Sequence, residues 1–281
     1  MPATPARIAR VSTAERAAGA QPSQDRVVVL ARAVAVLDGA SAPDPSERDG
    51  GWYAGQLAAE LAHRLEDPAL DLATILADAI AAVATGHRLT AGDSPSSTVT
   101  ILRWTDGRVD GLVLGDSPLV TVYADGRVED VVDDRLASVA PRQRVAYHDR
   151  LAAGGGYDDT HRRLLRELVG EQRRRRNRPD GYWIAEADAG AARHAIVRSW
   201  PAAAVSAALL ATDGVSRGIG GAAGMALPDW RSAYDLAMSA GPRAVLDAVR
   251  TPEEEDPDGR RWPRSKRHDD HALVLVVWKP E

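Results

Sequence analysis

The sequence predicts an α+β fold in which two antiparallel β-sheets pack as a sandwich flanked by α-helices. Short β-branched and apolar segments recur along the chain, Asp-Gly dipeptides typical of two-residue hairpins separate some of them, and stretches of helical periodicity lie between the groups of strands. Consecutive hairpins followed by helices indicate segregated α and β elements. With 281 residues, 44% of them hydrophobic, the chain can bury one large core, so a single domain spanning residues 1–281 is the simplest interpretation.

The first half of the chain is expected to form a strand pair, a helix pair and an antiparallel meander. Residues 27–30 and 33–37 are β-branched and apolar, as in buried strands. Leucine and isoleucine then recur at helical spacing on both sides of Pro68, which marks the break between two helices. These helices are expected over residues 54–66 and 71–85, and the meander strands over residues 98–104, 111–114, 119–123 and 127–132.

The second half is expected to begin with a basic, helix-rich insertion at about residues 140–180. It ends in four consecutive arginines, which we interpret as a solvated face, although such a run also suits phosphate-rich partners. Residues 251–267 are polar and Pro-rich and predict a mobile loop. Strands are expected over residues 192–199, 205–212 and 271–278, the last central in a sheet because it is continuously apolar, and helices over residues 230–239 and 242–250.

Composition excludes several classes of protein. The net charge of -5 provides no global field for nucleic acid, and no apolar run is long enough for a transmembrane helix, so neither nucleic acid nor membrane is an expected partner. The basic N-terminus lacks the apolar core and cleavage site of a secretory signal, which makes a cytoplasmic location the expectation. The chain has no cysteine, which excludes disulfides, thiolate zinc sites and a cysteine nucleophile.

Four aspartates lie at the ends of expected strands, in the segments AVAVLDGAS, LVLGDSPL, ALLATDGVS and RHDDHALVLVV. They are Asp38, Asp116, Asp213 and Asp269. Hard divalent cations prefer oxygen ligands, and a fold tolerates several carboxylates together mainly when metal cancels their repulsion. The set therefore predicts a metal site assembled from distant segments, although any one Asp-Gly taken alone is more often only a turn.

The order of these turns resembles the PPM (type 2C) family of metal-dependent Ser/Thr protein phosphatases, bacterial branch. The matching stretches are SQDR with Asp25, LDGA with Asp38 and Gly39, GDSP with Asp116, TDGV with Asp213, and DDHA with Asp269. The resemblance spans most of the chain and implies the same sandwich architecture. It also implies Mn²⁺ or Mg²⁺ as the cofactor, bound as two or three ions, with a phosphorylated protein as substrate.

The resemblance implies a role for each of these residues. Asp38 would bridge two ions, with the Gly39 carbonyl and Asp25, through water, serving one of them. Asp213 and Asp269 would complete the other, and Asp38 and Asp213 rank highest as catalytic residues. Asp116 resembles the residue that holds a third, weaker ion in bacterial members. Asp270 is the rival of Asp269, because a shift of one residue exchanges the two faces of a strand.

Two departures from the family pattern concern substrate binding and proton transfer. Many members carry a phosphate-gripping Arg where this chain has Ala20, so Arg26 becomes a candidate for that role. A His that can protonate the leaving group often follows the first Asp-Gly, but this chain has Ala40 there and no adjacent His. His268 is the candidate for a general acid or a partner of a metal ligand, against the alternative of a surface-loop residue.

Two functional hypotheses follow. The first is a metal-dependent phosphatase that hydrolyses phosphoserine or phosphothreonine by direct attack of a metal-bridging water. The second is a non-catalytic, PPM-like pseudophosphatase that acts as a binding or regulatory module in signalling. Retention of all the core aspartates favours the enzyme. The preferred metal, the physiological substrate, its kinase and the oligomeric state have no signature in the sequence.

Overall fold

The computed structural model describes residues 8–40, 48–220 and 226–278. Its strands are β1 (Ala9–Arg16), β2 (Asp25–Val29), β3 (Ala33–Asp38), β4 (Val99–Trp104), β5 (Arg108–Leu114), β6 (Leu119–Tyr123), β7 (Val128–Val131), β8 (Ile196–Pro201), β9 (Val205–Ala211) and β10 (His271–Trp278). Its α-helices are α1 (Gly50–Arg64), α2 (Leu72–His87), α3 (Pro141–Ala152), α4 (Asp159–Arg175), α5 (Asp213–Ser216), α6 (Trp230–Ala240) and α7 (Pro242–Glu255).

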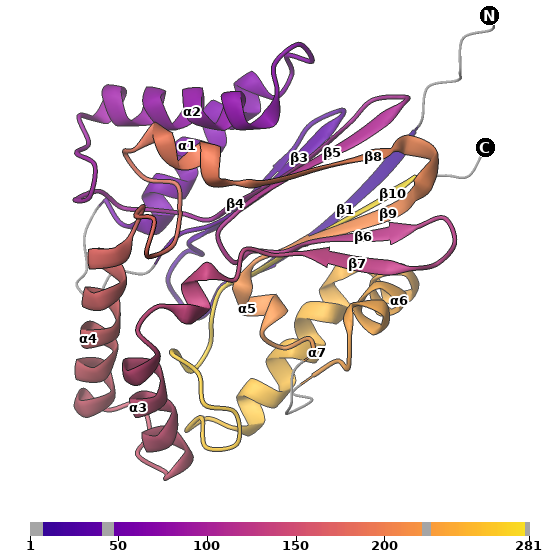
Figure 1. Ribbon diagram of the computed structural model, residues 1–281. Helices are drawn as coiled ribbons and strands as arrows, with labels where there is room; N and C mark the ends of the chain where they lie inside the picture. The colour runs from indigo at the N-terminus through magenta and orange to yellow at the C-terminus, as the bar shows by residue number, and fades with distance from the viewer. Residues whose placement is uncertain (1–7, 41–47, 221–225, 279–281) are drawn as a thin grey trace, which may run out of the picture.

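The described strands form two five-stranded antiparallel sheets, which confirms the expected α+β sandwich. The first sheet has the order β1-β10-β9-β6-β7 and the second the order β2-β3-β4-β5-β8. Helices α1 and α2 cover the outer face of the second sheet, and α6 and α7 cover that of the first (Figure 1). Within the described ranges, no helix has both the length and the apolar character needed to cross a membrane.

The arrangement of the layers explains why the sequences of β3 and β10 consist almost entirely of apolar residues. In β10, Val274 and Val276 belong to the core between the sheets, whereas Leu273 and Leu275 pack with the helices on the outer face. In β3 the residues alternate in the same way between the inter-sheet core and helices α1 and α2. Both strands are therefore buried on two faces, which removes the polar alternation of a half-exposed strand. As expected, β10 lies in the interior of its sheet, between β1 and β9.

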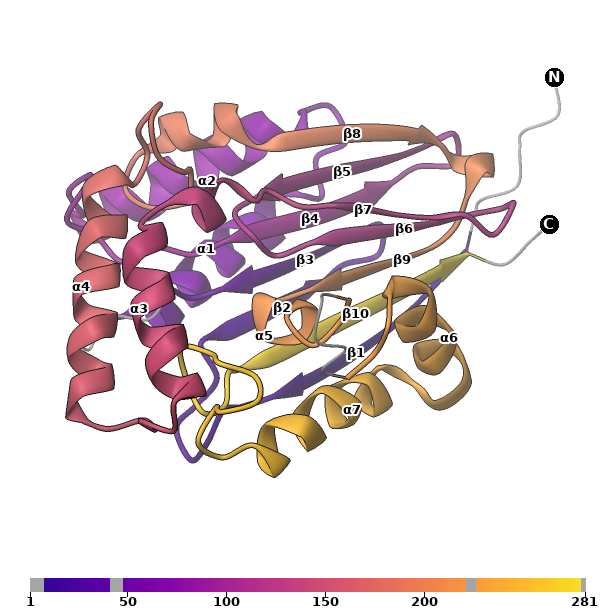
Figure 2. The same ribbon diagram turned by 60° about the horizontal axis from the view of Figure 1, so that its bottom comes forward.

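Helices α3 and α4 lie side by side at one end of the sandwich (Figure 2) and account for the expected basic helical segment. The arginine run ends α4, and two of its members form ion pairs with Glu171 on the exposed helix face. Arg176 departs from the expected solvated face, because it is buried and donates to the carbonyl of Ser94 at 3.0 Å. One arginine of the run thus anchors the helix end to the sandwich.

Three segments differ from the sequence-based expectation. Strand β1 was not expected, because it alternates polar and apolar residues at a sheet edge and gains its register from β10. The expected strand at residues 192–199 is instead a 3-10 helix, Ala189–His194, followed by β8, since Asp188 caps the 3-10 turn and the His194 ring stacks on Trp183. Helix α7 extends to Glu255, into the expected loop.

Asp71 caps the N-terminus of α2, where its side chain accepts hydrogen bonds from the backbone N–H groups of Ala73 and Thr74. We expect Asp71→Ala to lower the free energy of unfolding by about 1 kcal/mol, because these N–H groups lose their acceptor. Urea unfolding measures the change. Asp78→Ala, in the exposed middle of the same helix, is the matched control and should not destabilise. An equal loss in both variants would contradict the capping role.

Candidate metal centre

The strand register brings the predicted aspartates to the same end of the sandwich. Asp25 and Asp38 are direct cross-strand partners on β2 and β3. Asp213 follows the end of β9, and β10 begins beside that end, because Leu273 pairs with Ala211. The Asp116 turn precedes β6, whose first residue pairs with Leu210 near the end of β9. Antiparallel pairing thus gathers turns that lie as much as 244 residues apart in sequence.

Thr212 connects the two sheets at this end. Its hydroxyl donates to the carboxylate of Asp25 at 2.8 Å and accepts from the backbone N–H of Ala272 at 3.0 Å. Asp25 is 1% exposed, so the hydroxyl supplies a hydrogen bond to a carboxylate that is almost entirely removed from water. Sequence reasoning missed Thr212, although it stands directly before the second Asp-Gly.

The first Asp-Gly turn is held by backbone contact with helix α1. A Cβ added to Gly39 would lie 2.4 Å from the carbonyl carbon of Gly50, so only glycine allows the helix to begin against this turn. The carbonyl of Asp38 accepts hydrogen bonds from the Ser97 hydroxyl and the Thr98 N–H, both at 2.9 Å. The carbonyl group of Asp38 is therefore held by two hydrogen bonds.

The second Asp-Gly turn packs against the residues before β10. A Cβ at Gly214 would lie 2.1 Å from the carbonyl oxygen of Asp270, so here too the glycine is required by close approach. Asp213 is the first residue of the short helix α5, and Arg217 lies one turn further on. Its guanidinium joins Asp213 to Asp269, with 3.2 Å between Nη1 and Oδ2 of Asp269.

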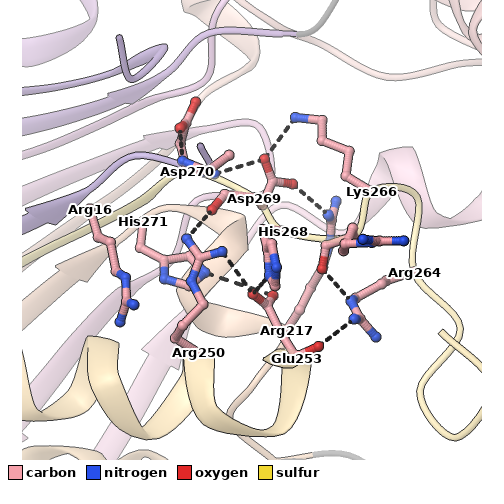
Figure 3. Close-up of polar contacts among 12 residues, drawn as sticks. Arg16, Arg217, Arg250, Glu253, Arg264, Lys266, His268, Asp269, Asp270 and His271 are labelled. Atoms are coloured by element: carbon pink, nitrogen blue, oxygen red, sulfur yellow. Dashed lines mark hydrogen bonds and ion pairs between the residues drawn. The ribbon is translucent and has the colours of Figure 1, made fainter. Parts of the chain in front are cut away.

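Asp269 and Asp270 have different surroundings. The carboxylate of Asp270 accepts backbone hydrogen bonds from Ala18 at 2.7 Å and Gln24 at 2.9 Å, which ties down the connection between β1 and β2. The carboxylate of Asp269 instead faces Arg217 and the ammonium of Lys266, at 2.7 Å (Figure 3). Asp270 is committed to the backbone, which favours Asp269 as the ligand.

Asp116 stands in the Gly-Asp-Ser turn between β5 and β6. The preceding Gly115 adopts φ +91°, a conformation that favours glycine, and its N–H approaches the Asp133 carboxylate at 3.5 Å. The Ser117 hydroxyl is buried against Thr98 Oγ1 at 2.7 Å, and the same Thr98 hydroxyl accepts from the backbone N–H of Asp38 at 3.2 Å. The Gly-Asp-Ser turn is thus connected to the first Asp-Gly turn through one threonine.

Crowding of the carboxylates raises several of their pKa values. Burial, and after it the charge of Asp213, raises the pKa of Asp38 well above its usual range. The same two causes raise the pKa of Asp116 to about 6. Burial also raises the pKa of Asp25, against the lowering effect of its Thr212 hydrogen bond. Burial alone would raise the pKa of Asp269, but Lys266 and Arg217 lower it.

The donor set suits a hard divalent cation in kind, because it consists of one buried and several partly buried carboxylates whose negative charges oppose one another. Within the described ranges, however, no three carboxylate or imidazole side chains converge closely enough to hold one ion. Asp213 and Asp269 are instead turned onto Arg217 and Lys266. Neither cation was singled out from the sequence, although each lies within four residues of one aspartate that it contacts.

The two candidate residues for phosphate binding and proton transfer, Arg26 and His268, are engaged by other groups of the protein. Arg26 donates to the carbonyls of Ser23 at 2.5 Å and Asp25 at 2.7 Å, so its guanidinium is engaged by its own loop. Nδ1 of His268 lies 3.2 Å from a carboxylate oxygen of Glu253 on α7, and burial lowers its pKa. The contacts of His268 are therefore with the buried Glu253 (Figure 3).

A sandwich of two antiparallel five-stranded sheets with helices outside matches the fold of the PPM-type phosphatases. The family model described as protein phosphatase 2C matches residues 14–244, and the chain belongs to this family. A comparison with curated protein sequences gave no significant match.

Solved structures support the same fold at low sequence identity. The Mycobacterium tuberculosis serine/threonine phosphatase PstP/Ppp is 16% identical, with a TM-score of 0.56 over 97% of this chain and 100% of that one. PppA, described as a key regulatory component of T6SS in Pseudomonas aeruginosa, is 16% identical, with a TM-score of 0.56 over 97% and 98%. The PstP catalytic domain in complex with two manganese ions is also 16% identical, with a TM-score of 0.57 over 98% and 100%.

Proposed function

We propose that this chain is a metal-dependent phosphoprotein phosphatase that hydrolyses phosphoserine or phosphothreonine, and that the whole chain acts as one catalytic domain. The observation that carries the proposal is the convergence of aspartates from both sheets at one end of the sandwich, with Asp25 and Asp38 facing each other across a strand pair. Membership of the protein phosphatase 2C family supports the same reaction class.

In this proposal Asp38 would contribute to holding both of two divalent ions, Mn²⁺ or Mg²⁺. Asp25, through water, and the Gly39 carbonyl would serve one ion, and Asp213 with Asp269 would serve the other. Bound there, the ions would lower the pKa of a shared water and offset the charge of the phosphoryl oxygens. The chain's own groups hold these ligands in place. Thr212 orients the Asp25 carboxylate, and the close contacts of Gly39 and Gly214 fix the two turns.

A second function, that of a non-catalytic binding module, has one specific observation in its favour. Arg217 and Lys266 occupy the carboxylates of Asp213 and Asp269, so part of the centre is neutralised without metal. Hydrolysis of a small aryl phosphate, assayed from pH 7 to 9 with Mn²⁺ and with EDTA, separates the two functions. The phosphatase proposal expects turnover only with Mn²⁺, whereas absence of metal-dependent turnover at every pH would favour the binding module.

Metal is also expected to stabilise the fold, because an ion that binds only the native state and relieves carboxylate repulsion raises the free energy of unfolding. At a free Mn²⁺ concentration of 100 times Kd the gain is about 2.7 kcal/mol for one site. Thermal melting of the metal-free protein during a Mn²⁺ titration measures it, and EDTA should reverse the rise in Tm. A constant Tm, together with no heat of binding in calorimetry, would argue against a metal site.

Asp116 is expected to hold a dispensable ion, because it resembles the residue that holds a third, weaker ion in bacterial members of the family. Asp116→Ala should lower the catalytic rate while the protein retains two bound ions, which metal counting by calorimetry can measure. Asp125→Ala is the control: this exposed hairpin aspartate contacts the backbone N–H of Arg127 and should change neither quantity. Loss of all bound metal in Asp116→Ala would place this residue in the core of the centre instead, and full activity would make its turn purely structural.

A further inference from the structure

The two halves of the aspartate group differ in how their charge is balanced. Asp213 and Asp269 share the guanidinium of Arg217, and Asp269 also contacts the ammonium of Lys266 at 2.7 Å (Figure 3). In the described part of the chain no ion pair reaches Asp25 or Asp38. One half therefore has two carboxylates in direct contact with two cations. In the other half neither carboxylate is part of an ion pair, and the charge of Lys266 acts on Asp38 only from beyond contact distance.

The cations contact the oxygens that a metal ion would need. Both groups are hydrogen-bond donors at contact distance from Asp269, one on each carboxylate oxygen. A carboxylate oxygen directed at an N–H is less available to a metal, and such charge-assisted hydrogen bonds are among the stronger polar contacts in proteins. A divalent ion that binds Asp213 and Asp269 must therefore displace or push aside both cations.

Lys266 is held in place by a buried anchor. It lies between α7 and β10, in the segment that the sequence suggested would be mobile. Two residues before it, Arg264 forms a buried ion pair with Asp256 at 3.2 Å and donates to the carbonyl of Glu253 at 2.9 Å. The side chains of Arg264 and Asp256 are 9% and 5% exposed. The backbone two residues before Lys266 is consequently anchored, and the Lys266 side chain, 39% exposed, reaches Asp269 from there.

Arg217 is positioned by helix α5. It follows the helix directly, and its backbone N–H donates to the carbonyl of Asp213 at 3.0 Å, which places its side chain one turn from the Asp213 carboxylate. The backbone of Gly214 is fixed against Asp270, so the whole turn, including the arginine, is set against the start of β10. The backbone of the turn therefore places the Arg217 side chain between Asp213 and Asp269.

We propose that Arg217 and Lys266 are internal counter-ions that occupy the Asp213–Asp269 half of the centre and compete with the metal there. This inference rests on the proposed metal centre and adds a property to it. The two ions bind with unequal affinity, the one at Asp25 and Asp38 tightly and the one at Asp213 and Asp269 weakly. The second half is then filled only when the concentration of divalent ions is high enough to displace the cations, which makes metal availability a control on the centre.

Calorimetric titration of Mn²⁺ into the metal-free full-length chain tests the proposal without an activity assay. The wild type should show two unequal binding steps. Arg217→Gln and Lys266→Gln should each tighten the weaker step by about tenfold, the scale of one charge-assisted contact, and leave the tighter step unchanged. Lys266→Arg retains the charge and should bind as the wild type does.

Arg231→Gln is the matched control. Arg231 lies on the remote helix α6 and forms an ion pair with Asp235, four residues away, which is the same spacing as between Asp213 and Arg217. This variant should leave both steps unchanged. Circular dichroism checks that each variant is folded. If Arg217→Gln does not fold, Lys266→Gln, which does not alter helix α5, is sufficient for the test.

The failure of this inference is distinguishable from the failure of the proposed function. The counter-ion role would be overturned if the wild type showed two binding steps and neither became tighter in Arg217→Gln and Lys266→Gln. That result would not contradict the proposed metal centre. No Mn²⁺ binding in any of the proteins would overturn both.

Discussion

Replacing Asp38 by Asn is expected to reduce Mn²⁺-dependent phosphate release by at least about a hundredfold, the scale on which one preorganised electrostatic contact contributes to catalysis. The substitution keeps the shape of the side chain and removes its charge, and in the proposed centre Asp38 is the only carboxylate shared by both ions. Because the pKa of Asp38 is raised by burial and by Asp213, loss of its charge should not destabilise the metal-free fold. Asp213→Asn is expected to reduce Mn²⁺-dependent phosphate release to a similar extent.

Steady-state release of phosphate from a phosphothreonine peptide, measured against Mn²⁺ concentration, is the test of this expectation. Asp125→Asn, in the exposed hairpin at the opposite end of β6, is the matched control and should retain full activity. A turnover number for Asp38→Asn close to that of the wild type at saturating Mn²⁺ would refute the assignment of Asp38 as the bridging ligand.

Replacing Gly214 by Ala is expected to produce the largest loss of stability among the substitutions considered. Its Cβ would overlap the carbonyl oxygen of Asp270 at 2.1 Å, and this backbone atom, directly before the start of β10, cannot move aside as a flexible side chain can. Forcing atoms into a packed site costs about 1–3 kcal/mol, and this contact belongs at the upper end of that range. The displacement would also separate Asp213 from Asp269, so Mn²⁺ should stabilise the variant less than it stabilises the wild type.

Urea unfolding with and without Mn²⁺ measures both effects in Gly214→Ala. Gly86→Ala is the control, because Gly86 lies in helix α2 with no atom within 4 Å of the added Cβ, and alanine there should stabilise by up to about 1 kcal/mol. If the two variants had the same stability, the contact between the Asp-Gly turn and Asp270 would not be needed to hold the turn.

Much of the fold could be predicted from local patterns because the central strands are buried on both faces. The segments of β3, β9 and β10 are almost entirely apolar, and the β4–β5 and β6–β7 hairpin turns carry Asp-Gly. Neither feature depends on distant context to be recognised. Strand β1 could not be recognised in this way, since its half-exposed sequence takes its structure from pairing with β10. The 3-10 helix before β8 depends on the stacking of His194 on Trp183, which is a tertiary contact.

The candidate site was predictable to a similar extent. The aspartates stand in recognisable turns, and antiparallel pairing brings those turns to one end of the sandwich. The groups that neutralise or orient them were not predictable, because Thr212, Arg217 and Lys266 acquire their contacts only when β9 and the segment before β10 are side by side. The choice between Asp269 and Asp270 likewise needed the backbone contacts of Asp270 with Ala18 and Gln24.

Anomalous scattering from crystals of the full-length chain grown with saturating Mn²⁺ tests most directly whether these turns form a metal centre. The proposed centre predicts two strong peaks within ligand distance of the Asp38 carboxylate, one beside Asp25 and the other beside Asp213 and Asp269, with Arg217 moved off the two aspartates. Crystals with no peak at these carboxylates, and with Arg217 still joining Asp213 to Asp269, would contradict it.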